Sequence, residues 1–193
     1  MNVYDFDHTI YDGDSSVDLY FYCLRRNPGV LRALPRQLAG TLGYYGTRKS
    51  RRTVEGKTAF KEAVYTYFSA VRDMDETVED FWDSHIQRVK LWYILQRRPE
   101  DVIISASPAF LIGPACERLG IRHQLSSNVG PATGLYIGLN CHGEEKVRRF
   151  REQFGQAQID EFYSDSLSDT PLARLAERAF LVKGDRRDPW PGL

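Results

Sequence analysis

The sequence predicts an α/β fold in which a parallel β-sheet lies between helices on both faces, with an all-helical segment inserted near the N-terminus. After residue 99, short apolar runs of the kind found in buried parallel strands alternate with amphipathic helical segments. A similar run of strand-forming residues opens the chain at residues 3–6. Between these regions, residues 14–98 show apolar residues at helical spacing and no strand pattern. We therefore expect an α/β core formed by residues 1–13 and 99–193, and a helical cap formed by residues 14–98.

Within the cap, breaks and capping residues divide the helical pattern into segments. Asp14, Ser15 and Ser16 are suited to cap a helix that runs to Arg26, where Asn27-Pro28-Gly29 ends it. In the next helix Pro35 predicts a kink or a split. We expect the apolar stripe of this helix to face the core; it consists of Val30, Leu31, Leu34, Leu38 and Leu42. Further helices are predicted for residues 53–71 and 75–98.

The second part of the chain supplies most of the predicted sheet. Residues 101–105 form an apolar run typical of a central strand. Ser107 is the expected N-cap of the following helix, with Pro108 at its first position. The remaining predicted elements are a strand at 120–125, a hairpin of 126–129 with 135–139, helices at 144–154 and 170–178, and strands at 159–163 and 179–183.

Composition limits the class of protein. With 193 residues, the chain fits one domain, or one domain with a large insertion. Lys plus Arg equals Asp plus Glu at 26 each, which gives no support for a nucleic-acid partner. Three cysteines without Cys-x-x-Cys spacing, and no zinc-site pattern, favour a reducing cytoplasm. A predicted strand at residue 3 leaves no room for a signal peptide, and no apolar run is long enough to span a membrane. Nothing in the sequence indicates the oligomeric state.

Four polar features fall at the ends of predicted strands or the beginnings of predicted helices. They are Asp5 with Asp7, Ser105, Lys146, and Asp165 with Asp169. In a parallel sheet these positions converge on the crevice beyond the carboxyl ends of the strands. Each feature alone is equally well explained as a turn, a helix cap or a solvated lysine. Together they combine clustered carboxylates suited to Mg²⁺ with a hydroxyl and a lysine suited to phosphate.

In this arrangement the sequence resembles the haloacid dehalogenase-like hydrolases, and within them subfamily IB, the phosphoserine phosphatase-like branch. That resemblance implies a three-layer, Rossmann-like core with an inserted helical cap. It also implies that Asp5 is the nucleophile that forms an aspartyl-phosphate and that Asp7 is the general acid, then base. Ser105 and Lys146 would hold the phosphoryl group, with Ser107 of the same turn beside the substrate. Mg²⁺ would be bound by Asp5, Asp165 and the main-chain carbonyl of Asp7, with Asp169 supporting the metal waters or Lys146.

Two departures from the family pattern are visible, and one position bears on the substrate. His8 and Ser164 stand where many members have Gly. Asp14 stands where phosphoserine phosphatases carry a Glu that meets the substrate amine. The resemblance therefore favours a Mg²⁺-dependent hydrolase of a small phosphorylated metabolite such as phosphoserine or another phospho-amine.

Several alternatives remain open at this stage. A phosphotransferase of the same fold would pass the phosphoryl group to an alcohol instead of water. A lipid-phosphate phosphatase would use the basic loop 47–52 and the helix 30–42 for peripheral contact with an anionic membrane, a reading we favour less. A carbon–halogen hydrolase needs neither Asp7 nor Asp165, and a non-catalytic interaction protein has no use for the whole set of site residues.

Overall fold

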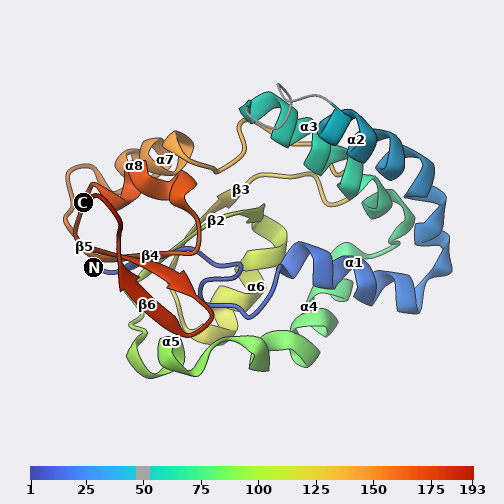
Figure 1. Cartoon of the computed structure of the whole chain (residues 1–193). Coiled ribbons are helices and arrows are strands. Elements are labelled where there is room, and N and C mark those ends of the chain that lie inside the picture. The colour runs from blue at the N-terminus through green and yellow to red at the C-terminus, as the bar shows by residue number, and fades with distance from the viewer. Residues whose placement is uncertain (47–52) are drawn as a thin grey trace.

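A six-stranded sheet forms the centre of the computed structural model, which describes residues 1–46 and 53–193 (Figure 1). The strand order is β3-β2-β1-β4-β5-β6, with β1 to β5 parallel and β6 antiparallel at one edge. The strands are β1 (Val3–Tyr4), β2 (Val102–Pro108), β3 (His123–Ser127), β4 (Ile159–Ser164), β5 (Ala176–Lys183) and β6 (Arg186–Pro189). The predicted α/β class is confirmed, whereas the edge strand β6 was not predicted.

The shortest strand occupies the middle of the sheet. Val3 and Tyr4 of β1 pair with β2 on one side and with β4 on the other, and both side chains are fully buried. Apolar, strand-forming residues fit this position because it is covered on both faces. All strands of the parallel part end at the same edge, so the loops that follow β1, β2 and β4 are brought together there.

Helices cover both faces of the sheet. One face carries α7 (Glu144–Phe154) and α8 (Thr170–Ala173), which pack through Phe150 and Leu172 against Val3 and Phe162. The other face carries α6 (Ala109–Leu119) and α5 (Leu91–Gln96). There the ring of Tyr4 stacks on Tyr163 at 4.9 Å between centroids. The three layers hold β1 rigidly, which fixes the position of the residues that follow it.

The elements assigned between β1 and β2 in the described residues are all helices, joined by short non-helical stretches. They are α1 (Ser15–Arg26), η1 (Pro28–Ala33), α2 (Leu34–Gly46), α3 (Val54–Tyr65), η2 (Thr66–Ala70), α4 (Met74–His85), η3 (Ile86–Arg88) and α5. The split predicted near Pro35 lies at the junction of η1 and α2, where proline is tolerated in a first helical turn. The loop 47–52, singled out by its basic residues, lies outside the described residues. Our division of the chain at residues 13 and 98 stays a prediction.

A continuous helix over residues 75–98 was predicted, and that prediction was wrong. The chain leaves the helix after α4, and Val89 forms an antiparallel bridge with Tyr11. The amide of Lys90 donates to the carbonyl of Ile10 (2.8 Å) before α5 begins. Pairing with the loop after β1 therefore overrides the helical pattern of the sequence at this point.

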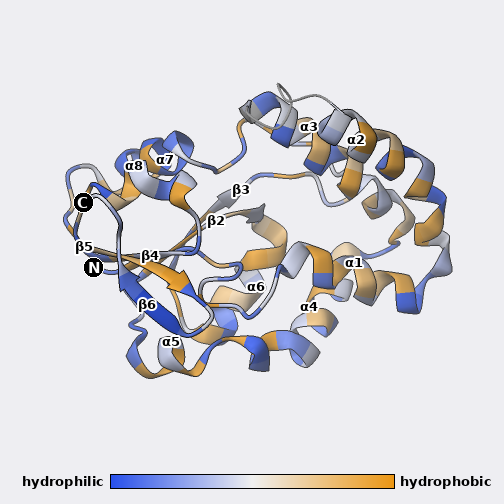
Figure 2. Cartoon of the chain, in the orientation of Figure 1, coloured by the Kyte–Doolittle hydropathy of each residue, from blue (hydrophilic) through white to orange (hydrophobic). Residues whose placement is uncertain are grey.

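The apolar stripe of residues 30–42 was expected to face the core, and four of its five members do not. Val30 is buried, but the exposed fractions of the four leucines range from 37% at Leu34 to 74% at Leu42. Leu31 lies in η1 and the other three leucines lie on α2, where Figure 2 shows hydrophobic residues. The reason is that α2 packs on α3 through a different side, where Gly40 lies directly against Ala63.

Three smaller expectations also require correction. Ser107 does not cap a helix, because β2 continues to Pro108 and α6 begins only at Ala109. The predicted hairpin is reduced to a single bridge between Val129 and Tyr136. The helix predicted for 170–178 ends at Ala173, since β5 begins at Ala176. Among the described residues, no helix is long and apolar enough to cross a membrane.

Candidate active site

The loop after β1 presents its carboxylates at the carboxyl edge of the sheet. Asp5 follows Tyr4 directly, and its amide donates to the carbonyl of Tyr163 on β4 (2.8 Å). His8 then takes a φ of +56°, and its amide donates to the carbonyl of Gly13 (2.8 Å). A left-handed conformation costs a non-glycine residue free energy, which explains why glycine would suit this position. The ammonium of Lys90 bonds the His8 carbonyl (2.8 Å) and holds the loop in this form.

Asp5 is tied to a buried lysine that also holds a second carboxylate. Lys146, near the beginning of α7, donates through Nζ to Asp5 Oδ1 (2.8 Å) and to Asp169 Oδ2 (2.7 Å). The hydroxyl of Ser164 donates to the same oxygen of Asp169 (2.8 Å). Burial alone would lower the pKa of Lys146, but the charges of Asp169 and Asp5 outweigh it and raise that pKa. Lys146 is therefore a permanent cation whose charge is already shared by two acids.

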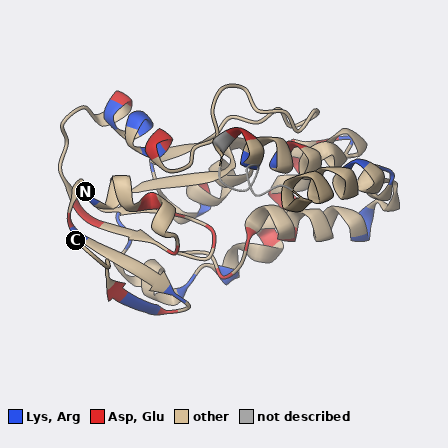
Figure 3. Cartoon of the chain, turned by 45° about the horizontal axis from the view of Figure 1, so that its top comes forward, with Lys and Arg blue, Asp and Glu red and all other residues tan. Residues whose placement is uncertain are grey.

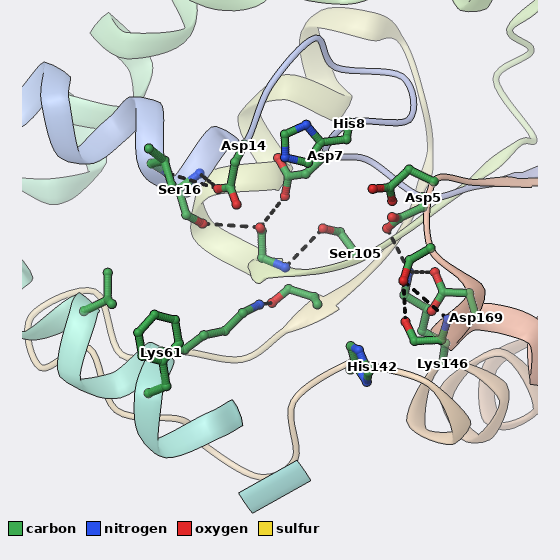
Figure 4. A pocket seen from close by; sticks show the side chains of 18 of the residues that line it. Asp5, Asp7, His8, Asp14, Ser16, Lys61, Ser105, His142, Lys146 and Asp169 are labelled. Carbon is green, nitrogen blue, oxygen red and sulfur yellow. Dashed lines mark hydrogen bonds and ion pairs between the residues drawn. The ribbon is translucent and has the colours of Figure 1, made fainter. Parts of the chain in front are cut away.

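Asp7 lies on the other side of the pocket and accepts two hydrogen bonds (Figure 4). The amide of Ser15, at the beginning of α1, donates to its Oδ1 (2.7 Å), and the hydroxyl of Ser107 donates to its Oδ2 (2.5 Å). Burial, followed by the nearby charge of Asp14, raises the pKa of Asp7, and the two hydrogen bonds oppose that rise. A carboxyl group with a raised pKa is suited to give up a proton and to take it back.

Between the two aspartates lies a local turn of the chain within β2, at residues 105–107, where the register of β2 with β3 shifts. Ser105 is 1% exposed, and its Oγ accepts a hydrogen bond from the amide of Ser107 (3.1 Å). Ser107 thus bonds Asp7 through its side chain and Ser105 through its backbone. The turn places the Ser107 hydroxyl beside Asp7 and the Ser105 hydroxyl in the pocket wall, close to the beginning of α6, and these donors suit an oxyanion of phosphate.

Acidic residues are distributed over several elements (Figure 3), and some of them lie in the loops that follow β1 and β4. Asp165 follows β4, and its amide donates to the hydroxyl of Thr9 (2.9 Å). Burial raises the pKa of Asp5 to about 7 and also raises the pKa of Asp165; the neighbouring Asp169 adds to both shifts. Lys146 alone forms ion pairs with this group of acids among the described residues. The excess of negative charge is what a bound hard cation would relieve.

The donor set fits Mg²⁺ better than a softer metal. Asp5 and Asp165 offer carboxylate oxygens, and the carbonyl of Asp7 is available from the same loop, as Mg²⁺ sites with several waters require. Asp169 is engaged by Lys146 and Ser164, which places it behind the lysine. Within residues 1–46 and 53–193, no group of three or more acidic, histidine or cysteine side chains is arranged so that these side chains alone could hold a metal ion.

The side of the pocket away from Asp5 combines Asp14, which the sequence singled out, with residues that it did not. The cavity measures about 290 Å³, and Asp14, Val17, Phe60, Lys61 and His142 are part of its wall. Asp14 caps α1 through Oδ1, which accepts from the amides of Ser16 and Val17 (3.0 Å each). The pocket thus has an acidic, hydroxyl-rich floor and a mixed apolar and basic wall.

Lys61 and His142 were missed because no local pattern marks them. Lys61 looks like one of many charged residues on an amphipathic helix, yet its Nζ reaches the carbonyl of Ala106 (2.9 Å). His142 follows a long loop, and its Nε2 lies 3.3 Å from Lys57 Nζ. Burial, helped by the charge of Lys57, lowers the pKa of His142 to about 4, so this ring is neutral at physiological pH.

Comparison with known proteins gives consistent results. The family model of the haloacid dehalogenase-like hydrolases matches residues 3–174. Over 222 aligned residues the chain is 23% identical to a histidinol-phosphatase of Neisseria meningitidis, with 100% of this chain and 97% of that protein covered. A probable phosphatase of Mycobacterium tuberculosis is 30% identical over 92 residues, which cover 44% of this chain and 32% of that protein.

Solved structures share the fold at low sequence identity. A Bordetella pertussis protein of unknown function superposes with a TM-score of 0.74 at 19% identity, covering 94% of this chain and 88% of that one. A phosphoserine phosphohydrolase-like protein from Francisella tularensis gives 0.56 at 15% identity, with 96% and 88% covered. A phosphoserine phosphatase solved as a phospho-aspartyl intermediate analogue gives 0.51 at 16% identity, with 96% and 93% covered.

Proposed function

Because the chain belongs to the haloacid dehalogenase-like hydrolases, within which it is a phosphatase, we propose that it hydrolyses phosphomonoesters with Mg²⁺ through an aspartyl-phosphate on Asp5. The observation that carries this proposal is the placement of two differently held carboxylates on opposite sides of one pocket. Asp5 is fixed by the cation of Lys146, and Asp7 is half-buried between two hydrogen-bond donors. Two acids in such different surroundings are suited to two roles, nucleophile and proton donor.

The residues of the chain provide each part of the reaction. A carboxylate oxygen of Asp5 forms a bond to phosphorus while the bond from phosphorus to the leaving oxygen breaks. Asp7 gives its proton to that leaving oxygen. In the second half, Asp7 takes a proton from water, the water oxygen bonds to phosphorus, and the bond to Asp5 breaks, which releases phosphate. Ser105 and Lys146 orient the phosphoryl group throughout.

Mg²⁺ fits between the two acidic loops, where Asp5, Asp165 and the Asp7 carbonyl would hold it. When bound, the ion neutralises charge on the phosphoryl oxygens. Lys146 contacts Asp5 on one side and Asp169 on the other, so that its ammonium is oriented from two sides. Asp169 therefore orients Lys146, and the carboxylate ligands of the metal would be Asp5 and Asp165.

The experiment is a phosphatase assay with Mg²⁺ or with chelator on purified variants. Asp5→Asn removes all hydrolysis, since an amide cannot form the acyl-phosphate, and Asp7→Asn slows it by roughly 10²–10⁴-fold. The matched control is Asp12→Asn, which changes an exposed carboxylate of the same loop and leaves activity unchanged. Near-normal turnover of Asp5→Asn, or full activity in excess chelator, would contradict the mechanism. If the wild type hydrolysed no phosphomonoester, the alternative of a non-catalytic interaction protein would be favoured.

For the substrate, we propose a small phosphorylated metabolite with an amine, because Asp14 is on the pocket wall and only its Oδ1 is used by α1. Asp14→Asn keeps the helix cap but removes the charge. It should raise KM for phosphoserine and phosphoethanolamine and leave KM for an uncharged aryl phosphate unchanged. An equal effect on all three would show that Asp14 acts through α1 and not on an amine.

Assays that contain glycerol would detect transfer to an alcohol as phosphate release that lags behind leaving-group release.

A lipid phosphate is the second candidate, and the exposed leucines of α2 are the observation that favours it. The test is hydrolysis of a lysolipid phosphate in the double variant Leu38→Gln, Leu42→Gln. The control is Leu91→Gln, Leu95→Gln, which removes two leucines of similar exposure from α5. Selective loss with the α2 pair, together with preference for the lipid over soluble esters, would place the lipid phosphate first.

A further inference from the structure

Lys61 extends from the cap into the pocket and contacts the core. It lies on α3, and its Nζ donates to the carbonyl of Ala106 (2.9 Å). Ala106 is the residue between Ser105 and Ser107, in the turn proposed to hold the phosphoryl group. Figure 4 shows the Lys61 side chain reaching across the cavity toward that turn. The ammonium therefore lies next to the place where phosphate would bind.

The charge of Lys61 is not neutralised by an ion pair with any described residue, in contrast to Lys146. Lys146 forms ion pairs with both Asp5 and Asp169, whereas no described carboxylate lies within 4.0 Å of Lys61. A carbonyl oxygen is its recorded partner, and it can satisfy only one of the three donors of an ammonium group. Burial lowers the pKa of Lys61, which is the cost of holding a cation there without a close counter-ion.

The position of this cation relative to the acids indicates which part of a substrate it meets. Among the acids, the charge of Asp14 acts on Lys61 most strongly, followed by Asp7 and then Asp5. Figure 4 shows Lys61 on the side of the pocket where Asp7 and Asp14 lie, away from Asp5, beside which Mg²⁺ would be held. A phosphate dianion between Asp5 and Asp7 would have the metal on one side and would lack a cation on the other without Lys61.

From this geometry we propose that Lys61 is a phosphate-binding residue, contributed by the cap, that bonds an oxygen of the substrate phosphoryl group. The proposal rests on the proposed phosphatase function for its substrate, but it also predicts binding of free inorganic phosphate. It gives the cap a direct part in holding the group that reacts, in addition to any part in recognising the leaving group. Every phosphomonoester should depend on it, whatever its leaving group.

The test compares Lys61→Met, Lys61→Arg and Lys57→Met with the wild type. Lys57 is one helical turn earlier on α3, contacts His142 and is not part of the pocket wall, so its replacement is the matched control. Two quantities are measured with Mg²⁺: the inhibition constant of inorganic phosphate against an aryl phosphate, and the rise in melting temperature caused by phosphate. Neither requires knowledge of the natural substrate.

Lys61→Met should raise the inhibition constant of phosphate and the KM of the aryl phosphate together, by about tenfold to a hundredfold, as for a lost hydrogen bond to a charged group. The rise in melting temperature with phosphate should disappear, while Lys57→Met keeps it and Lys61→Arg keeps part of it. An unchanged inhibition constant in Lys61→Met would overturn the proposal, as would a lower phosphate-free melting temperature with a normal phosphate response. If the wild type binds phosphate through Lys61 but hydrolyses no ester, the proposed function fails and this inference stands.

Discussion

Replacing Lys146 with methionine should destabilise the protein far more than replacing another buried lysine. Lys146 is 2% exposed and bonds two carboxylates, one of which, Asp169, is 2% exposed itself. Methionine has a similar length but no charge, so Asp5 and Asp169 would be left as buried acids without their counter-ion. Breaking a buried ion pair in this way costs about 3–5 kcal/mol. With a urea m-value of about 3 kcal/mol/M, the unfolding midpoint should fall by about 1–2 M.

The assay is urea unfolding in chelator, because bound Mg²⁺ would replace part of the lost charge. Lys90→Met is the control: Lys90 is also buried, but it bonds the carbonyls of His8 (2.8 Å) and Gly184 (2.7 Å) instead of carboxylates. Its loss should cost about 1–3 kcal/mol. The double variant Lys146→Met, Asp169→Asn should lose less unfolding free energy than the sum of the losses in the two single variants. A loss below about 1 kcal/mol for Lys146→Met, or strict additivity, would refute the view that Lys146 balances these acids.

Three further predictions concern pH, metal and the contact between loop and cap. The pKa of His142 is lower in the folded protein than in the unfolded chain. The contribution of the neutral ring to stability is therefore complete above about pH 6.5 and is lost as pH falls toward 4. Urea unfolding of His142→Asn should show a smaller loss of unfolding free energy over this pH range than the wild type. Asp165→Ala should weaken Mg²⁺ binding measured by calorimetry, with activity partly recovered at high Mg²⁺; tight Mg²⁺ binding by the variant would exclude Asp165 as a ligand. Ca²⁺ should inhibit the wild type because its looser coordination shell misplaces the reacting groups. Gly134→Ala should cost more than about 1–2 kcal/mol in unfolding free energy, because φ is +73° and the added carbon would lie 2.5 Å from the Tyr65 carbonyl oxygen. The control is Gly138→Ala at φ +89°, where the added carbon meets no such atom and only the backbone cost is measured.

The reacting side of the site was predictable because each of its residues stands next to a strong local signal. Asp5 follows an apolar strand, Ser105 lies in the last part of another, and Lys146 lies at the beginning of a helix whose bounds match the predicted 144–154. In a parallel sheet such positions converge by topology alone. Approximate strand positions are therefore enough to bring these groups together, even though the sequence misjudged where β2 ends.

Elements whose position depends on partners far away in the sequence were predicted less well. The helix expected for 75–98 is interrupted because Val89 pairs with Tyr11, and no residue near 89 signals that contact. The leucines of α2 have the spacing of a buried stripe, but periodicity identifies an apolar face without showing what covers it. Here Gly40 and Ala63 bring α2 onto α3 by another face, so the leucines remain outside.

The same distinction explains why the sequence indicates the reaction more readily than the substrate. The groups proposed to act on phosphorus lie next to strand ends, but the opposite wall is formed by α1, α3 and the loop that leads to His142. These parts meet only through tertiary contacts, such as the one between Gly134 and Tyr65. Lys61 enters the pocket because α3 is held there, and its own surroundings in the sequence do not mark it. Under the proposed function, discrimination among phosphomonoesters depends on how α3 packs against the loop that contains Gly134. Changes at this contact should therefore alter substrate preference before they alter the chemistry at Asp5.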